Sequence, residues 1–243
     1  MKNGILFGAT SEIGIAIVQE CLKTQDWQFF TAGSKPTHKS FGSRNLTHIF
    51  IDWAKVKPID ENLFLHDKIP LMDFVIVSLG FVSQTEEQLY SSEIVRSISA
   101  NLTWPLICID FLNRNKRLSD DAVIVIVSSA LVNISDNRKS FVYTHLKSTL
   151  EYILKSAHRH ELMNRNIIFL RPGFVPTKLN RHLKSGKFAV GVEDIAQVLI
   201  QRIRRGKKSG VVYAPTRLAL LANLIRIFPK RIQRKILRKL QNM

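Results

Sequence analysis

The sequence has few cysteines, and their scarcity excludes two classes of protein. Cys21 and Cys108 are the only two in 243 residues, too few for a disulfide-rich scaffold, and their spacing matches no metal site. We expect both thiols to be reduced and buried in a cytosolic protein. Long apolar runs are also lacking. None approaches the roughly 20 residues that span a bilayer, and Gly4, Gly8 and Glu12 interrupt the first apolar stretch, unlike a signal peptide.

Acidic residues are missing from one end of the chain. None follows Asp194, whereas thirteen of the 36 basic residues lie between Arg202 and Lys239. The first 194 residues therefore carry 23 basic against 19 acidic side chains, and most of the net charge of +17 lies beyond them. This asymmetry indicates an anionic partner surface, either a membrane or a nucleic acid.

Apolar segments of strand length alternate with helical patterns along the chain. The predicted strands cover residues 3–8, 27–33, 47–52, 73–80, 122–129, 166–173 and 210–215. The predicted helices cover residues 12–23, 85–112 with a bend near Pro105, 143–162 and 192–204. Several strands are apolar throughout, as expected when helices cover both faces of a sheet. We predict one Rossmann-like, doubly wound α/β domain over residues 1–215, with a mostly parallel sheet of about seven strands.

A glycine-containing turn, Gly8-Ala9-Thr10-Ser11-Glu12-Ile13-Gly14, follows the first strand and opens the first helix. Small residues at this point let the backbone and the helix N-terminus approach a pyrophosphate. The three-glycine fingerprint is incomplete, because Glu12 stands at the middle glycine. A plain turn in which Thr10 or Ser11 caps the helix is the alternative.

The second strand ends in Gly33-Ser34-Lys35, without the acidic residue that usually holds the ribose of NAD. Ser34 and Lys35 are therefore candidate contacts for a 2′-phosphate. This favours NADPH slightly and leaves NADH open; a solvated loop lysine is the alternative.

A serine, a tyrosine and a lysine form the candidate catalytic group. Ser128 and Ser129 end a buried strand, where ligand sites open in α/β folds. Tyr143 and Lys147 follow, four residues apart, which puts them on one face of a helix. We expect the ammonium to lower the pKa of the phenol, so that the phenol exchanges a proton with a substrate oxygen held by a serine hydroxyl.

In this order, these pieces resemble the short-chain dehydrogenase/reductase family over nearly the whole chain. The matching residues are the Gly8–Gly14 turn, Asp52, Asn101, Ser129, Tyr143–Lys147 and Arg171–Thr177. The sequence departs from the family at Val77-Ser78-Leu79-Gly80, where the family has Asn-Asn-Ala-Gly, and at Glu12.

The resemblance implies an NAD(P)H-dependent enzyme and assigns roles to residues. Tyr143 is the acid–base, Ser129 orients the substrate carbonyl, Lys147 also holds the nicotinamide ribose, and Asn101 supports a water relay to that lysine. The implied cofactor contacts are Gly8, Thr10, Ser11, Glu12, Ile13, Gly14, Asp52 at the adenine, and Pro172, Gly173, Val175 and Thr177 at the nicotinamide.

One subgroup of the family shares further features with this chain. Glu12, the segment Asn166–Thr177, and Tyr213-Ala214-Pro215 followed by a basic tail resemble the reductases of decaprenylphosphoryl-ribose epimerisation. This resemblance implies reduction of a polyprenyl-phosphate-linked 2-keto-pentose to its arabinose form, in arabinan precursor synthesis for the cell wall, with a flavin oxidase as partner.

The C-terminal appendage, residues 216–243, combines an apolar stretch with a basic amphipathic one. Residues 230–241 place Ile232, Ile236, Leu237 and Leu240 on one face and cations around the rest, the pattern of a helix lying on anionic lipid. We therefore expect a cytoplasmic protein peripheral to the inner face of the membrane, with the periplasmic side left open. A helix packed on the body or on another subunit is the main alternative, and nucleic acid is less favoured.

Three cations, Arg181, Lys184 and Lys187, are candidate contacts for a substrate phosphate, with a solvated basic loop as the alternative. Two other functions stay open: a reductase of a soluble carbonyl or acyl-carrier substrate, and a non-catalytic nucleotide-binding scaffold or sensor. No metal is expected, and a homo-oligomer is a further option.

Overall fold

The computed structural model describes residues 1–24, 26–35, 46–51, 53, 69–83, 92–133, 141–160, 164–179, 189–220, 224 and 232. Its sheet has seven strands in the order β3-β2-β1-β4-β5-β6-β7, and every neighbouring pair is parallel. The strands are β1 Lys2–Phe7, β2 Trp27–Gly33, β3 Leu46–Phe50, β4 Met72–Val77, β5 Leu118–Val127, β6 Asn166–Pro172 and β7 Gly210–Ala214. The predicted Rossmann-like α/β fold is thus confirmed.

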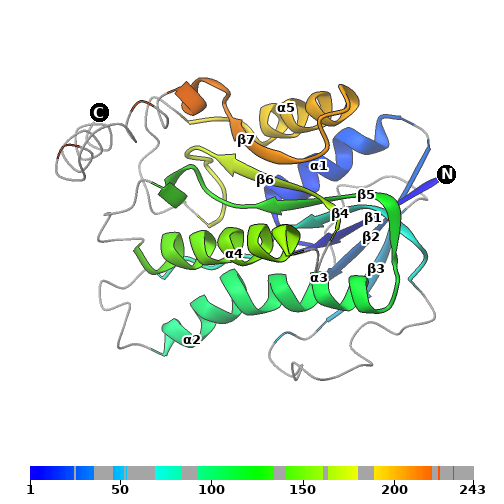
Figure 1. The fold of residues 1–243 in the computed structure, drawn as a ribbon, viewed down its shortest axis with the longest axis horizontal. Helices are drawn as coiled ribbons and strands as arrows, with labels where there is room; N and C mark the ends of the chain where they lie inside the picture. The colour runs from blue at the N-terminus through cyan, green and yellow to red at the C-terminus, as the bar shows by residue number, and fades with distance from the viewer. Residues whose placement is uncertain are drawn as a thin grey trace.

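Helices cover both faces of the sheet (Figure 1). They are α1 Glu12–Leu22, α2 Glu93–Ile98, α3 Trp104–Arg114, α4 Phe141–Arg159 and α5 Val192–Arg204. Helices α1 and α5 pack together on one face, and α2, α3 and α4 lie on the other. The continuously apolar strands follow from this arrangement, because each strand buries side chains in both layers.

Each face of the sheet has its own apolar core. Ile17 of α1 and Leu199 of α5 pack with the β1 side chain Leu6 in one core. Leu112 of α3 and Leu150 of α4 pack with Ile124 of β5 in the other. All six are fully buried, so the sheet is held rigidly between two layers and its carboxyl-end loops rest on a fixed frame.

The long helix predicted to bend near Pro105 is interrupted just before this proline. A π-helical turn, η2 (Ser99–Thr103), joins α2 to α3, and the Trp104 N–H bonds to the Ser99 carbonyl five residues earlier. Pro105 has no N–H to offer the preceding turn, so the regular ladder is broken here. Residues 85–91 of the predicted helix lie outside the described residues.

In the part of the chain that the structure describes, no helix is both long and apolar enough to span a bilayer. Most of the predicted appendage lies outside that part.

Candidate active site

The glycine turn after β1 brings the chain against the end of β4. Gly8 has a φ of +99°, and a Cβ at this position would lie 2.5 Å from the Ser78 carbonyl oxygen. Ser11, not Thr10, caps α1: its Oγ accepts from the Gly14 N–H at 3.2 Å. The same Oγ shares a 2.6 Å hydrogen bond with the Ser78 Oγ. Only glycine fits at position 8, where both the φ and the close approach exclude a side chain.

This turn fits the phosphates of a dinucleotide. The backbone N–H groups of Thr10, Glu12 and Ile13 donate to no described residue, so the N-terminus of α1 keeps free donors for an anion. Ser34 and Lys35 are exposed after the end of β2, on the side where the adenosine ribose would lie. Asp52, predicted to contact adenine, lies outside the described residues.

The Glu12 side chain reaches across the site. Its Oε2 accepts a 2.7 Å hydrogen bond from the backbone N–H of Lys178. Lys178 directly follows Thr177, which is buried together with Val175. The residue that departs from the glycine fingerprint therefore joins the phosphate turn to the segment predicted to hold the nicotinamide.

Backbone hydrogen bonds hold that segment against β7 and against Val190, which comes later in the chain. The Gly173 N–H donates to the Ala214 carbonyl at 2.8 Å, and the Val190 N–H donates to the Phe174 carbonyl at 3.0 Å. Pro172 ends β6. The predicted substrate cations Arg181, Lys184 and Lys187 lie outside the described residues.

Tyr143 and Lys147 lie in the first turns of α4, as predicted. The Lys147 side chain is buried, and its Nζ donates to the carbonyls of Leu79 at 2.8 Å and Val127 at 3.0 Å. These carbonyls come from the residues that follow β4 and end β5, so the ammonium lies where the two strands end. The third N–H of the ammonium has no partner among the described residues and is free to hold a ligand oxygen.

The expected direction of the Tyr143 pKa is wrong. Burial raises the pKa of the Tyr143 phenol to about 12, because the charged phenolate loses its water. The Lys147 Nζ lies 5.9 Å from the centre of the phenol ring, and burial lowers its own pKa to about 8. Without bound ligands, Tyr143 is therefore a protonated phenol at neutral pH, suited to donate a proton.

The two serines that end β5 have different partners. Ser128 Oγ donates to Glu151 Oε1 at 2.7 Å, so this hydroxyl is tied to the body of the protein. Ser129 Oγ accepts from the Leu131 N–H at 3.2 Å, and its own proton goes to no described residue. Ser129 is therefore the serine that can donate to a substrate oxygen.

Asn101, fully buried in the π-helical turn, fixes the strand-end loop after β4. Its Nδ2 donates to the carbonyls of Phe81 at 2.7 Å and Ser97 at 2.9 Å, and its Oδ1 accepts from the Phe81 N–H at 3.2 Å. A Cβ on Gly80 would lie 3.4 Å from this Oδ1 and 3.8 Å from the Lys147 Nζ. The side chains of Asn101 and Lys147 thus both lie close to Gly80, where a larger residue would crowd them.

Glu151, to which no sequence motif gives a role, lies at the centre of a buried polar network behind these residues. The signal was its spacing: Tyr143, Lys147 and Glu151 recur every four residues, which places a carboxylate on the catalytic face of α4. Among the described residues, no group of three or more His, Cys, Asp or Glu side chains could hold a metal ion.

No family model matches the chain, whereas solved structures of the same architecture do. A short chain dehydrogenase family protein from Francisella tularensis superposes with a TM-score of 0.72 at 20% identity, over 88% of this chain and 96% of the other. A short chain dehydrogenase from Burkholderia cenocepacia in complex with NADP gives 0.78 at 14% identity, over 98% and 99%.

A carbonyl reductase from Pseudomonas aeruginosa gives a TM-score of 0.69 at 18% identity, over 89% of this chain and 98% of the other. At these identities the similarity shows the fold alone. The shared fold extends along nearly the full length of each neighbour. The chain therefore has the fold of the short-chain dehydrogenases and reductases.

Proposed function

We propose that this protein is an NAD(P)H-dependent reductase that converts a ketone to a secondary alcohol. One observation carries the proposal: Tyr143 and Lys147 lie on one face of α4, and the Lys147 ammonium bonds to the residues at the ends of β4 and β5. Ligands bind at the carboxyl ends of strands in such sheets. A proton donor and a cation thus lie where a nucleotide and its substrate would meet.

Each catalytic side chain has a task that its surroundings support. The Tyr143 phenol, protonated at neutral pH, donates its proton to the ketone oxygen. The free Ser129 hydroxyl orients that oxygen, and the unpaired N–H of Lys147 holds a ribose hydroxyl of the cofactor. Asn101 keeps the strand-end loop in place and supports a water relay. When bound, the reduced nicotinamide supplies the hydride that the carbonyl carbon accepts.

The cofactor would lie along the strand ends from β2 to β6. Its phosphates fit the turn from Gly8 to Gly14, and the segment from Pro172 to Thr177 fits the nicotinamide. NADPH is slightly favoured over NADH, because the residues after β2 offer Ser34 and the Lys35 cation rather than an acid. The Burkholderia cenocepacia neighbour in complex with NADP is consistent with this preference.

For the substrate, we favour a polyprenyl-phosphate-linked 2-keto-pentose, reduced to its arabinose form after a flavin oxidase has produced the ketone. Arg181, Lys184 and Lys187 would contact the phosphate. The basic appendage would rest on anionic lipid, which suits a substrate whose chain stays in the bilayer. In the described part of the appendage, Leu220, Leu224 and Ile232 are exposed apolar side chains. A soluble carbonyl substrate is the second candidate, favoured by the likeness to a carbonyl reductase.

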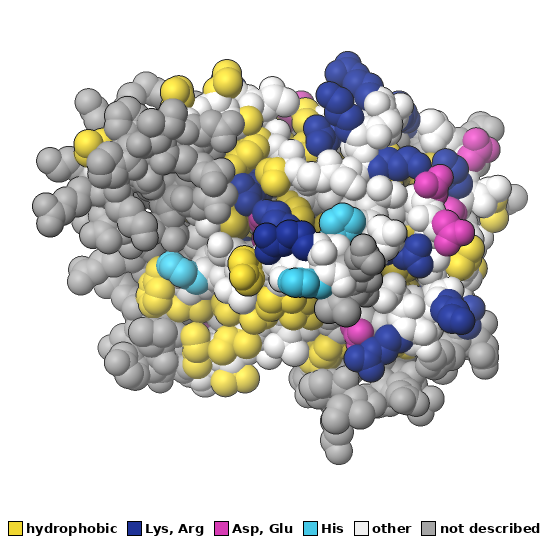
Figure 2. All heavy atoms as spheres, in the orientation of Figure 1, with side chains coloured by type: hydrophobic (Ala, Val, Ile, Leu, Met, Phe, Trp, Pro, Cys, Tyr) yellow, Lys and Arg dark blue, Asp and Glu magenta, His cyan; other side chains and the backbone are white. Residues whose placement is uncertain are grey.

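A homo-oligomer is supported by an apolar surface on α2 and α4. Hydrophobic side chains gather over these helices at the lower left of Figure 2. The exposed ones are Val95 and Ile98 on α2 and Tyr152 and Ile153 on α4. Contiguous apolar surface of this kind is typical of an interface.

The test is oxidation of NADPH and of NADH by the purified full-length chain. Two kinds of substrate are compared. One is a lipid-linked 2-keto-pentose, made by a flavin oxidase and carried in membranes, and the other is a panel of soluble ketones. Oxidation that requires the keto-pentose supports the favoured substrate, and oxidation with soluble ketones alone replaces it by the second candidate. Nucleotide binding without oxidation by any ketone contradicts the enzymatic proposal and favours a scaffold or sensor.

A further inference from the structure

The carboxylate of Glu151 lies on the catalytic face of α4. It follows Lys147 by one turn and Tyr143 by two, so the three side chains line one stripe of the helix. Glu151 is only 2% exposed. A buried carboxylate is costly unless donors surround it, so its partners indicate what it is there to hold.

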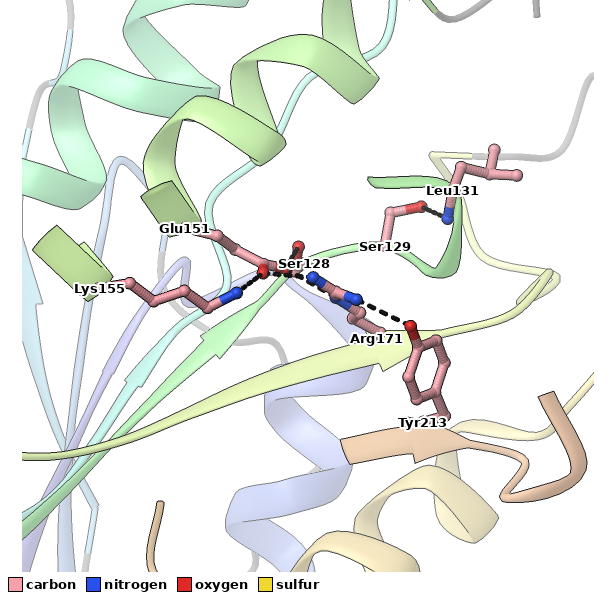
Figure 3. A network of polar contacts seen from close by, with 7 residues as sticks. All are labelled: Ser128, Ser129, Leu131, Glu151, Lys155, Arg171 and Tyr213. Carbon is pink, nitrogen blue, oxygen red and sulfur yellow. Dashed lines mark hydrogen bonds and ion pairs between the residues drawn. The ribbon is translucent and has the colours of Figure 1, made fainter. Parts of the chain in front are cut away.

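Four donors converge on this carboxylate (Figure 3). Its Oε1 accepts from Ser128 Oγ at 2.7 Å and from Arg171 Nε at 2.9 Å. Its Oε2 accepts from Arg171 Nη2 at 2.6 Å and from Lys155 Nζ at 2.8 Å. Arg171 binds in the two-pronged geometry that fixes both position and orientation, and its Nη1 donates to the Tyr213 hydroxyl at 2.7 Å.

These partners lie directly beside residues of the candidate active site. Ser128 precedes Ser129 at the end of β5, and Arg171 precedes Pro172 and Gly173 at the end of β6. Through Ser128, Glu151 therefore connects α4, which carries Tyr143, to the end of β5, where Ser129 lies. Through Arg171, it also connects α4 to β6, which leads into the nicotinamide segment.

The charge of Glu151 also acts on Lys147. Among the described residues, the Lys147 ammonium hydrogen-bonds to the neutral carbonyls of Leu79 and Val127, and its burial lowers its pKa. Glu151 is the charged group that opposes this effect and raises the lysine pKa. In the described part of the chain, the Tyr143 ring on α4 faces the ammonium and the Asn101 amide on η2 lies, like the ammonium, close to Gly80, and both side chains are neutral at pH 7.

We propose that Glu151 is a positioning residue of the reductase site, which fixes Ser129 and Gly173 relative to Tyr143 and Lys147 and keeps the Lys147 ammonium charged. The inference rests on the proposed function. If the ion pair only stabilised the fold and its charge did not act on Lys147, breaking it would change the melting temperature and leave the titration of Lys147 where it was.

The experiment titrates Lys147 directly in the full-length chain. Protein labelled with 13C at the lysine Cε is followed by NMR against pH, and the Lys147 resonance is assigned by its loss in Lys147→Met. Three variants are compared with the wild type. Glu151→Gln removes the charge, Glu151→Asp keeps the charge and withdraws it by one methylene, and Asp110→Asn removes an exposed carboxylate paired with Arg114 on α3 as a matched control.

We expect Glu151→Gln to lower the Lys147 midpoint by about one pH unit, whereas Glu151→Asp and Asp110→Asn leave it near the wild-type value. In the reductase assay, the alkaline fall of kcat should move with the midpoint in Glu151→Gln. Glu151→Asp should lower kcat about tenfold at an unchanged pH profile, since it disturbs geometry alone.

An unchanged Lys147 midpoint in Glu151→Gln, with the fold intact by circular dichroism, would overturn the inference. If Glu151→Gln does not fold, Glu151→Asp carries the test, and wild-type kcat in that variant overturns the positioning role. If the wild type reduces no ketone, the proposed function fails, while the NMR midpoint still decides whether Glu151 controls the charge of Lys147.

Discussion

Glu12 and Lys178 lie 166 residues apart in the sequence, yet the Glu12 carboxylate accepts a 2.7 Å hydrogen bond from the Lys178 backbone nitrogen. The bond closes the phosphate turn onto the nicotinamide segment. It also places a negative charge at the helix N-terminus that would face the cofactor phosphates. For NADPH binding the hydrogen bond is favourable and the negative charge is unfavourable. Two substitutions separate these two contributions.

Glu12→Ala removes the bond and the charge, and Glu12→Gln keeps an acceptor oxygen without the charge. Because both variants lack the charge, their difference isolates the bond. We expect Glu12→Ala to bind NADPH about fivefold more weakly than Glu12→Gln, since a net hydrogen bond contributes about 1 kcal/mol. Glu12→Gln should bind NADPH at least as tightly as the wild type. Fluorescence titration of both variants measures this, and equal affinity in Glu12→Ala and Glu12→Gln would show that the bond does not hold the site closed.

Gly8 and Gly206 form a matched pair of glycines with positive φ. A Cβ at Gly8 would strike the Ser78 carbonyl, whereas a Cβ at Gly206 meets nothing within 4 Å. Gly206→Ala should therefore lower the free energy of unfolding by about 1 kcal/mol, through backbone strain alone. Gly8→Ala should lower the free energy of unfolding clearly more and abolish NADPH binding. Equal losses in urea unfolding, with binding intact in both variants, would contradict this account of the turn.

Ser129 and Ser128 are adjacent, and their contacts predict different phenotypes. Ser129→Ala should lower kcat/KM at least about tenfold, the cost of a lost hydrogen bond in the transition state, with a nearly unchanged melting temperature. Ser128→Ala removes a donor from buried Glu151 and should lower the melting temperature more than Ser129→Ala does. Steady-state kinetics and calorimetry on the pair test this, and the reverse pattern would move the catalytic role to Ser128.

Much of this architecture could be predicted from the sequence, because buried parallel strands are apolar throughout and stand out from the helices between them. Trp27–Gly33 matches its predicted strand at both ends. The start of β5 could not be predicted: Ser119, Asp120 and Asp121 are polar, and they enter the strand at an irregularity opposite Met72 and Phe74.

The chemistry of the site was harder to predict than its position. The order of glycine turn, serine, tyrosine and lysine predicted the strand ends at which the candidate site lies. The raised pKa of Tyr143 depends on its burial in the folded chain, which no local pattern reveals. In the sequence, Glu151 looks like an ordinary solvent-exposed glutamate on a helix. Its partner Arg171 lies 20 residues away and reaches it only in the folded chain, where β6 and α4 come together.

The buried Lys147 should also make stability depend on pH. Its pKa is about 8 in the folded protein and about 10.5 when exposed. Between these values the unfolded chain binds more protons, so the free energy of unfolding rises with pH there. Relative to Lys147→Met, the wild type should gain roughly 1 kcal/mol per pH unit between pH 8 and 10. Urea unfolding at several pH values measures this, and a constant difference would mean that Lys147 is not neutralised in the fold.

The central claim is that Tyr143 donates the proton in a carbonyl reduction. Its most direct test compares ketone-dependent NADPH oxidation by the wild type and by Tyr143→Phe, with NADPH binding and melting temperature measured on both. We expect kcat to fall about 100-fold or more, as for the loss of a general acid, with binding and fold unchanged. Near wild-type turnover in Tyr143→Phe would contradict the claim.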